Sequence, residues 1–120
     1  NSEINVFGHK YSIINQDYIK AIFQKIYKLN PNENEQSFIL AKEALALSTK
    51  INWDGGIAES NYLLANVYVD RRDYINQIKC YLIAADRFKK INSYRGEAES
   101  YLGISIAYEL NKKFISLAVL

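Results

Sequence analysis

The sequence repeats itself at an offset of 40 residues, and this limits the chain to architectures built from similar, stacked units. Residues 51–80 align without gaps with residues 91–120, and eight of the 30 positions are identical. We therefore expect about three repeats, near residues 16–50, 51–90 and 91–120, with the last one truncated. The identical pairs are Ile51/Ile91, Asn52/Asn92, Gly56/Gly96, Ala58/Ala98, Glu59/Glu99, Ser60/Ser100, Tyr68/Tyr108 and Ile75/Ile115.

Apolar residues within the repeats recur at the spacing of an α-helix. Between residues 73 and 90 they form one helical stripe of Tyr74, Ile78, Tyr81, Leu82, Ala85 and Phe88. The same spacing predicts helices over residues 18–29, 36–50 and 57–69, and a last helix from about Lys112 to Leu120. Residues 1–15 have no firm period and are expected to form an irregular or strand-like arm.

Short polar segments separate the predicted helices. Asp73 ends the segment DRRD and is a good N-cap for the helix that follows. Asp54 or Ser93 can cap the helix that enters the next repeat, and Gly56 or Gly96 keeps the first turn of that helix slim. Each repeat is therefore predicted to be a pair of helices joined by a tight turn.

The composition favours one packed helical domain. Hydrophobic residues make up 49% of the chain, which is enough for one core. With 15 basic and 13 acidic side chains the net charge is only +2, so the chain has no strong excess of positive charge that would attract nucleic acid or an anionic membrane. No apolar run approaches the ~20 residues that span a bilayer, and no secretion signal is present, so we expect a cytoplasmic location. Since the chain begins without Met and stops in an apolar stretch, we expect it to be a piece of a longer protein.

Several spaced positions resemble the tetratricopeptide repeat, over roughly residues 16–120. The matching residues are Leu64, Ala65, Tyr68, Tyr74, Tyr81 and Ala84 in one repeat, and Ile104, Ser105, Tyr108 and Phe114 in the next. The resemblance implies an all-α solenoid of antiparallel helix hairpins, with Tyr68, Tyr74, Tyr81 and Tyr108 packed in the core. The chain departs from the family at Gln77 and Leu117, where a small residue is usual, and in lacking the closing Pro.

The 40-residue period and the Gly-x-Ala-Glu helix entry are similar to the longer repeats of bacterial signalling proteins. This resemblance implies a protein-binding or peptide-binding module, serving as the scaffold or the sensory input part of a larger signalling protein. The alternative is a peptide-sensing regulator whose repeat curvature changes when a short peptide binds.

The first helix of each repeat is expected to line a concave surface that holds the partner. Asn66 matches the asparagine of tetratricopeptide domains that clamp a carboxylate, but Tyr62 stands where those domains carry Lys, so a carboxylate clamp is not expected. Glu99 and Glu109 instead suit a partner with a basic group. The predicted binding residues are Tyr62, Asn66, Val69, Asp70, Glu99, Leu102, Ile106 and Glu109.

No constellation of residues predicts catalysis, a metal site or a cofactor. The repeated Glu59 and Glu99 would lie on the order of 10 Å apart, but solvated acids of a first helical turn explain them more simply. His9 has no neighbouring ligand, and the single cysteine, Cys80, is expected to be a small apolar residue near the groove between helices. We therefore expect a binding protein and not an enzyme.

The last predicted helix has no polar cap and exposes an apolar end. We expect this C-terminal end to form a homodimer or to pack against further repeats. The residues concerned are Phe114, Ile115, Leu117, Ala118, Val119 and Leu120.

Overall fold

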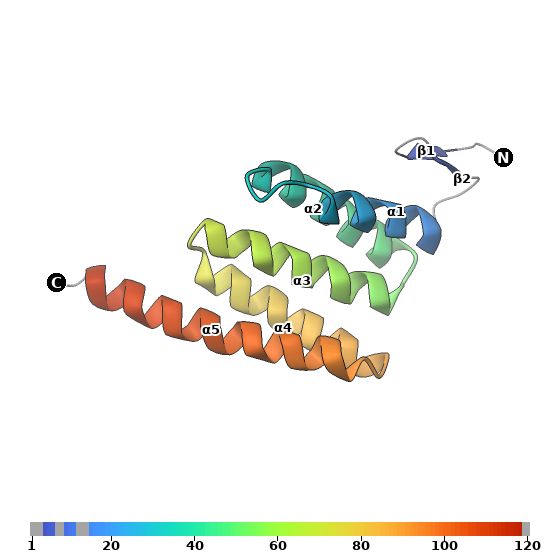
Figure 1. The fold of residues 1–120 in the computed structure, drawn as a ribbon. Coiled ribbons are helices and arrows are strands. Elements are labelled where there is room, and N and C mark those ends of the chain that lie inside the picture. The colour runs from blue at the N-terminus through green and yellow to red at the C-terminus, as the bar shows by residue number, and fades with distance from the viewer. Residues whose placement is uncertain (1–3, 7–8, 12–14, 119–120) are drawn as a thin grey trace.

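The computed structural model describes residues 4–6, 9–11 and 15–118, and its fold is carried by helices (Figure 1). Two three-residue strands, β1 (Ile4–Val6) and β2 (His9–Tyr11), pair antiparallel ahead of the helices, with Val6 opposite His9. The predicted helical fold is confirmed. The helices are α1 (Gln16–Tyr27), α2 (Asn34–Lys50), α3 (Asp54–Asp70), α4 (Tyr74–Lys90) and α5 (Tyr94–Ala118).

Each helix packs against the next one along the chain, and the molecule is elongated, 60 × 32 × 20 Å (Figure 1). The beginning of α3 lies against the end of α4, where Arg87 Nη1 is 2.8 Å from Asp54 Oδ1. Further along the same pair, the Tyr81 hydroxyl donates to Asn66 Oδ1 at 2.6 Å. No helix within residues 15–118 is both long enough and apolar enough to cross a membrane.

Helices α2, α3 and α4 end in the same backbone motif. A left-handed residue follows each helix: Asn52 (φ 55°), Arg72 (φ 56°) and Asn92 (φ 59°). The next backbone N–H reaches back five residues, as Trp53 N does to the Ser48 carbonyl at 2.9 Å. This is the Schellman motif, which satisfies carbonyls at the helix end and turns the chain sharply. The equivalent bonds run from Asp73 N to Tyr68 O (3.1 Å) and from Ser93 N to Phe88 O (2.9 Å).

The predicted N-cap at Asp73 is confirmed, because its carboxylate accepts from Asn76 N at 3.2 Å. The predicted cap at Asp54 is wrong. Asp54 is the first residue of α3, Trp53 is the N-cap, and no side chain caps this helix. The Asp54 carboxylate pairs with Arg87 instead. The Asp54 side chain therefore joins α3 to α4 and does not cap its own helix.

The predicted break near residue 112 is also wrong, because α5 runs unbroken for 25 residues. Offset by 40, Lys113 stands where Asp73 caps α4, and a lysine cannot accept the hydrogen bonds of free backbone N–H groups. The turn is therefore lost and the helix continues. Its end packs on α4, where the Phe114 ring lies 6.2 Å from the Tyr74 ring.

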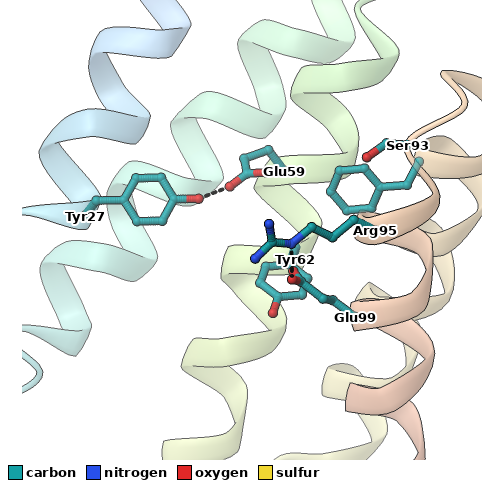
Figure 2. A pocket seen from close by; sticks show the side chains of 8 residues that line it. Tyr27, Glu59, Tyr62, Ser93, Arg95 and Glu99 are labelled. Carbon is teal, nitrogen blue, oxygen red and sulfur yellow. Dashed lines mark hydrogen bonds and ion pairs between the residues drawn. The ribbon is translucent and has the colours of Figure 1, made fainter.

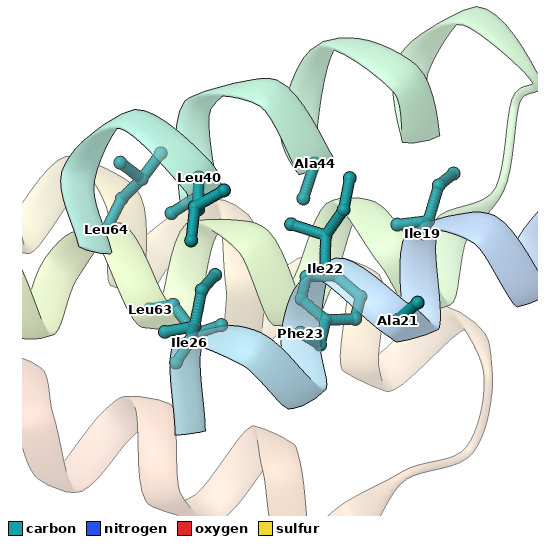
Figure 3. Close-up of a cluster of buried hydrophobic side chains, with 10 residues drawn as sticks. Ile19, Ala21, Ile22, Phe23, Ile26, Leu40, Ala44, Leu63 and Leu64 are labelled. Carbon is teal, nitrogen blue, oxygen red and sulfur yellow. The ribbon is translucent and has the colours of Figure 1, made fainter. Parts of the chain in front are cut away.

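The main hydrophobic core joins α1, α2 and α3 (Figure 3). Ile19 and Ile22 are the most deeply buried side chains of α1, and they belong to one cluster with Leu40 and Ala44 of α2 and Leu63 of α3 (Figure 3). Burying a side chain of this size stabilises the fold by about 1.5–3 kcal/mol. Ala44 is fully buried, as is Ala84 at the equivalent position of the next repeat, and both let neighbouring helices approach closely.

Glycines make the same close contact in successive repeats. A Cβ at Gly96 would lie 2.6 Å from the Phe88 ring, and a Cβ at Gly56 would collide with Ser48 and with the Trp53 ring. Phe88 and Ser48 are themselves 40 residues apart. The predicted role of both glycines, keeping the first turn slim, is therefore confirmed.

Candidate functional site

A groove opens between α1, α3 and α5 (Figure 2). Its deeper part is a cavity of about 370 Å³. Aromatic rings and three charged side chains make up its wall. The lining residues are Tyr27, Glu59, Tyr62, Phe88, Ser93, Arg95, Gly96 and Glu99.

Two carboxylates from equivalent positions face this cavity. Glu59 of α3 accepts a hydrogen bond from the Tyr27 hydroxyl of α1 (Figure 2). Glu99 of α5 accepts from Arg95 Nε at 3.1 Å. Burial raises the pKa of Glu59, and the neighbouring Glu99 raises it further. The groove thus contains a carboxylate that is both partly desolvated and repelled by a second one.

Within residues 15–118, Glu59 has no cationic partner of its own. Arg95 is paired with Glu99, and among residues 15–118 no Lys or Arg forms an ion pair with Glu59. A half-buried carboxylate gains most when a positive charge or further donors approach it. The groove is therefore suited to bind a positively charged group.

Tyr62 forms the aromatic floor beside the carboxylates. Its ring contacts Tyr81 at 5.6 Å and Phe88 at 6.5 Å, both nearly edge to face. Burial raises the pKa of Tyr62, and Glu99 and Glu59 add to that rise. Aromatic faces beside carboxylates are a favourable setting for a guanidinium or an ammonium group.

A second, shallower hollow of about 310 Å³ continues the groove towards the beginning of α3. It shares Tyr27, Glu59 and Phe88 with the first cavity and adds an apolar wall. The groove thus has an acidic end and an aromatic end, which suits an extended chain with a charged and an apolar side chain. The added residues are Phe23, Trp53, Gly55 and Ile91.

Two of the eight predicted binding residues, Tyr62 and Glu99, line this groove. Asn66 lies away from it and accepts from the Tyr81 hydroxyl. Val69 is half-buried and Asp70 is exposed at the end of α3. Leu102, Ile106 and Glu109 are exposed on α5 and do not line the cavity.

Glu59 was visible in the sequence as a repeated acid, but its predicted solvated place in a first helical turn is wrong. Because α3 begins at Asp54, Glu59 is the sixth helical residue, and it is half-buried. Its partner Tyr27 had no sequence indication, since α1 lies outside the clear 40-residue alignment. Phe88 belongs to the predicted apolar stripe, and Arg95 and Gly96 lie in the predicted helix entry.

Cys80 behaves as the predicted small apolar residue. Its side chain is half-buried against the main core, and burial raises the pKa of its thiol to about 11. Within the part of the chain that the structure describes, no three His, Cys, Asp or Glu side chains are grouped to hold a metal ion. The side chain of His9 and the terminal residues 119–120 lie outside the described residues.

Comparisons of the chain with protein-family models, with curated proteins and with solved structures found no match. The tetratricopeptide resemblance therefore rests on the residues of this chain. The functional argument in turn rests on the geometry of the groove.

Proposed function

We propose that this chain is a polypeptide-binding module that holds a basic side chain of its partner in the groove between α1, α3 and α5. The observation that carries this proposal is Glu59, a half-buried carboxylate with a raised pKa and no cationic partner among the described side chains. A guanidinium or ammonium group placed there would neutralise the repulsion between Glu59 and Glu99.

The architecture we propose is a solenoid of antiparallel, tetratricopeptide-like hairpins. Three observations support it: the shared helix ends at Asn52, Arg72 and Asn92, the equivalent glycine contacts, and the pairing of the start of α3 with the end of α4. In such a solenoid α1, α3 and α5 are the first helices of successive hairpins, and first helices line the concave face.

The partner we propose is an extended peptide segment with one Arg or Lys and one large apolar side chain. The basic group would lie between Glu59 and Glu99, above the ring of Tyr62. The apolar side chain would lie beside Trp53 and Phe23 in the adjoining hollow. A charge-assisted hydrogen bond at the acidic end is worth about 1.5–3 kcal/mol, or at least about tenfold in affinity.

The test uses pools of short random-sequence peptides that carry a fixed central Arg, norleucine or Glu. Fluorescence polarisation should show that the Arg pool binds about tenfold more tightly than the norleucine pool. Glu59→Gln should abolish that preference, because the amide keeps an oxygen for the Tyr27 hydroxyl but carries no charge.

Glu109→Gln is the matched control, since it removes an exposed carboxylate from α5 that does not line the cavity. This variant should keep the preference for the Arg pool. Equal binding of the three pools, or no binding of any pool, would contradict the proposal. A preference that survives in Glu59→Gln would contradict the assigned site.

Scaffold and sensory roles both remain predictions of the sequence, and both would use this groove. They differ in what binding does to the molecule. A regulator would change its repeat curvature when a peptide bridges Glu59 of α3 and Glu99 of α5.

A further inference from the structure

One face of α5 carries large apolar side chains at intervals of seven residues. Tyr94, Tyr101, Tyr108 and Ile115 have exposed fractions of 71%, 50%, 60% and 54%. Seven residues are nearly two turns of an α-helix, so these side chains form one stripe over about 32 Å. Ile104 lies beside the stripe and is half-buried.

The exposure of the middle of this stripe departs from the preceding repeat: at the positions equivalent to Tyr101 and Tyr108, Asn61 is 3% exposed and Tyr68 is half-buried. At the positions equivalent to Ile104 and Ser105, α3 carries Leu64 and Ala65, which neighbouring helices bury to 3% and 0% exposure. Tyr108 was expected in the core by its place in the repeat, and that expectation is wrong. The unbroken course of α5 leaves these positions without the helix that covers them in α3.

We propose that a second copy of this chain covers the stripe, with the two α5 helices packed antiparallel about a twofold axis between Ile104 and Ser105. In an antiparallel pair, one copy runs up while the other runs down, so two residues lie at the same level when their numbers add up to a fixed sum. For an axis between Ile104 and Ser105 that sum is 209. With the axis placed there, Tyr101 faces Tyr108 of the second copy, and Tyr94 faces Ile115. Residues spaced by seven stay on one side of a helix, so the four side chains can all meet the same side of a second helix.

The charges on this face match the same register. Glu97 and Lys112 flank the stripe, and the sum of their numbers equals that of Tyr101 and Tyr108. The register therefore places Glu97 opposite Lys112 of the second copy, and the twofold axis repeats this pair at the other end. A parallel arrangement would bring each charge beside its own kind, which is destabilising. Charge complementarity thus favours a second copy of this chain, packed antiparallel, as the partner that covers the stripe.

This interface is independent of the proposed function. Glu99 lies about 170° around α5 from the centre of the stripe, given about 100° per residue. The groove would remain open in the dimer. Failure of peptide binding would therefore leave the dimer proposal intact, and the reverse also holds.

The first test measures the dissociation constant of the dimer by sedimentation equilibrium over a concentration series. Glu97→Lys alone and Lys112→Glu alone should each weaken the dimer about tenfold or more, because each creates two like-charge pairs. The double variant Glu97→Lys/Lys112→Glu should recover the original constant within about threefold. A monomer at every concentration, or a double variant no tighter than the single ones, would overturn the proposal.

The second test is a cross-link at the twofold axis. At an interaxial distance of about 9 Å, the two copies of Ser105 lie about 6 Å apart between Cα atoms, which a disulfide can bridge. Ser105→Cys should therefore form a covalent dimer under mild oxidation. Two controls should stay uncrosslinked: Ser116→Cys, far from the axis on the same helix, and the unaltered chain with its half-buried Cys80. Equal cross-linking at residues 105 and 116 would exclude the register.

Discussion

Glu59 lies where its environment opposes its negative charge. The side chain is half-buried, a second carboxylate stands nearby, and one hydroxyl donates to it. A folded-state pKa above the ordinary glutamate value means that the folded chain holds this proton more tightly than the unfolded chain. Its contribution to stability is therefore full at low pH, and it is lost as the pH rises through the raised pKa.

Glu59→Gln removes this pH dependence. The free energy of unfolding of the variant, relative to the original chain, should rise between the ordinary glutamate pKa and the raised pKa of Glu59, and then stay level. Urea unfolding at a series of pH values measures this difference. Glu109→Gln serves as the control and should show no such step. A difference that falls with rising pH would mean that a favourable partner, and not desolvation, governs Glu59.

Gly96 holds the first turn of α5 against α4. Gly96→Ala should lower the free energy of unfolding by about 1–3 kcal/mol, because the new Cβ would lie 2.6 Å from the Phe88 ring. Alanine favours a helix by about 1 kcal/mol over glycine, so the clash must outweigh that gain. Denaturant melts compare it with Gly55→Ala, which meets only the Trp53 side chain at 2.9 Å. Equal effects at both glycines would refute the close contact.

Tyr62 and Glu99 could be placed in the groove from the sequence, because helical phase alone assigns them to one face of the first helices. Glu59 was predicted only as a repeated, solvated acid, so neither its place in the groove nor its burial followed from the sequence. Its environment depends on Tyr27, which comes from a helix that the 40-residue alignment does not reach. Contacts between repeats of unequal sequence are thus the part of the site that periodicity does not reveal.

At the scale of the element, the turn between α3 and α4 differs from its counterpart in α5 by a few side chains. Residues 70–73 end with Asp73, which caps α4, whereas residues 110–113 end with Lys113, and the helix runs on. The existence and approximate bounds of the first four helices could be predicted from the sequence, through the apolar spacing and the turn residues. The continuity of α5 could not be predicted in this way. The repeat alignment shows which positions correspond, but it does not show that Lys113 lacks the capping group of Asp73.

Asp73→Ala should lower the free energy of unfolding by about 1 kcal/mol, the usual cost of losing an N-cap. For a domain of this size that corresponds to a fall in Tm of about 4 °C. Differential scanning calorimetry measures the change, with Glu109→Ala as the control for the loss of an exposed acid. An unchanged Tm would show that the left-handed turn at Arg72 ends the helix without help from Asp73.

At the scale of the whole molecule, stacking of successive helices creates the groove. No single helix contains it, since Tyr27 comes from α1, Glu59 and Tyr62 from α3, and Glu99 from α5. The helical class and the repeated units could be predicted from the sequence. The depth of the groove depends on how far each helix is rotated against the helices it packs on, and side-chain packing decides that rotation.

The proposal that the groove binds a basic side chain is tested most directly by the pKa of Glu59 in solution. Carboxyl-carbon NMR titration should find this pKa above that of an ordinary glutamate in the free chain. Saturation with an Arg-containing peptide should lower it, because a cation at the carboxylate favours the charged form. An ordinary pKa in the free chain, or a raised pKa that the bound peptide leaves unchanged, would contradict the proposed site.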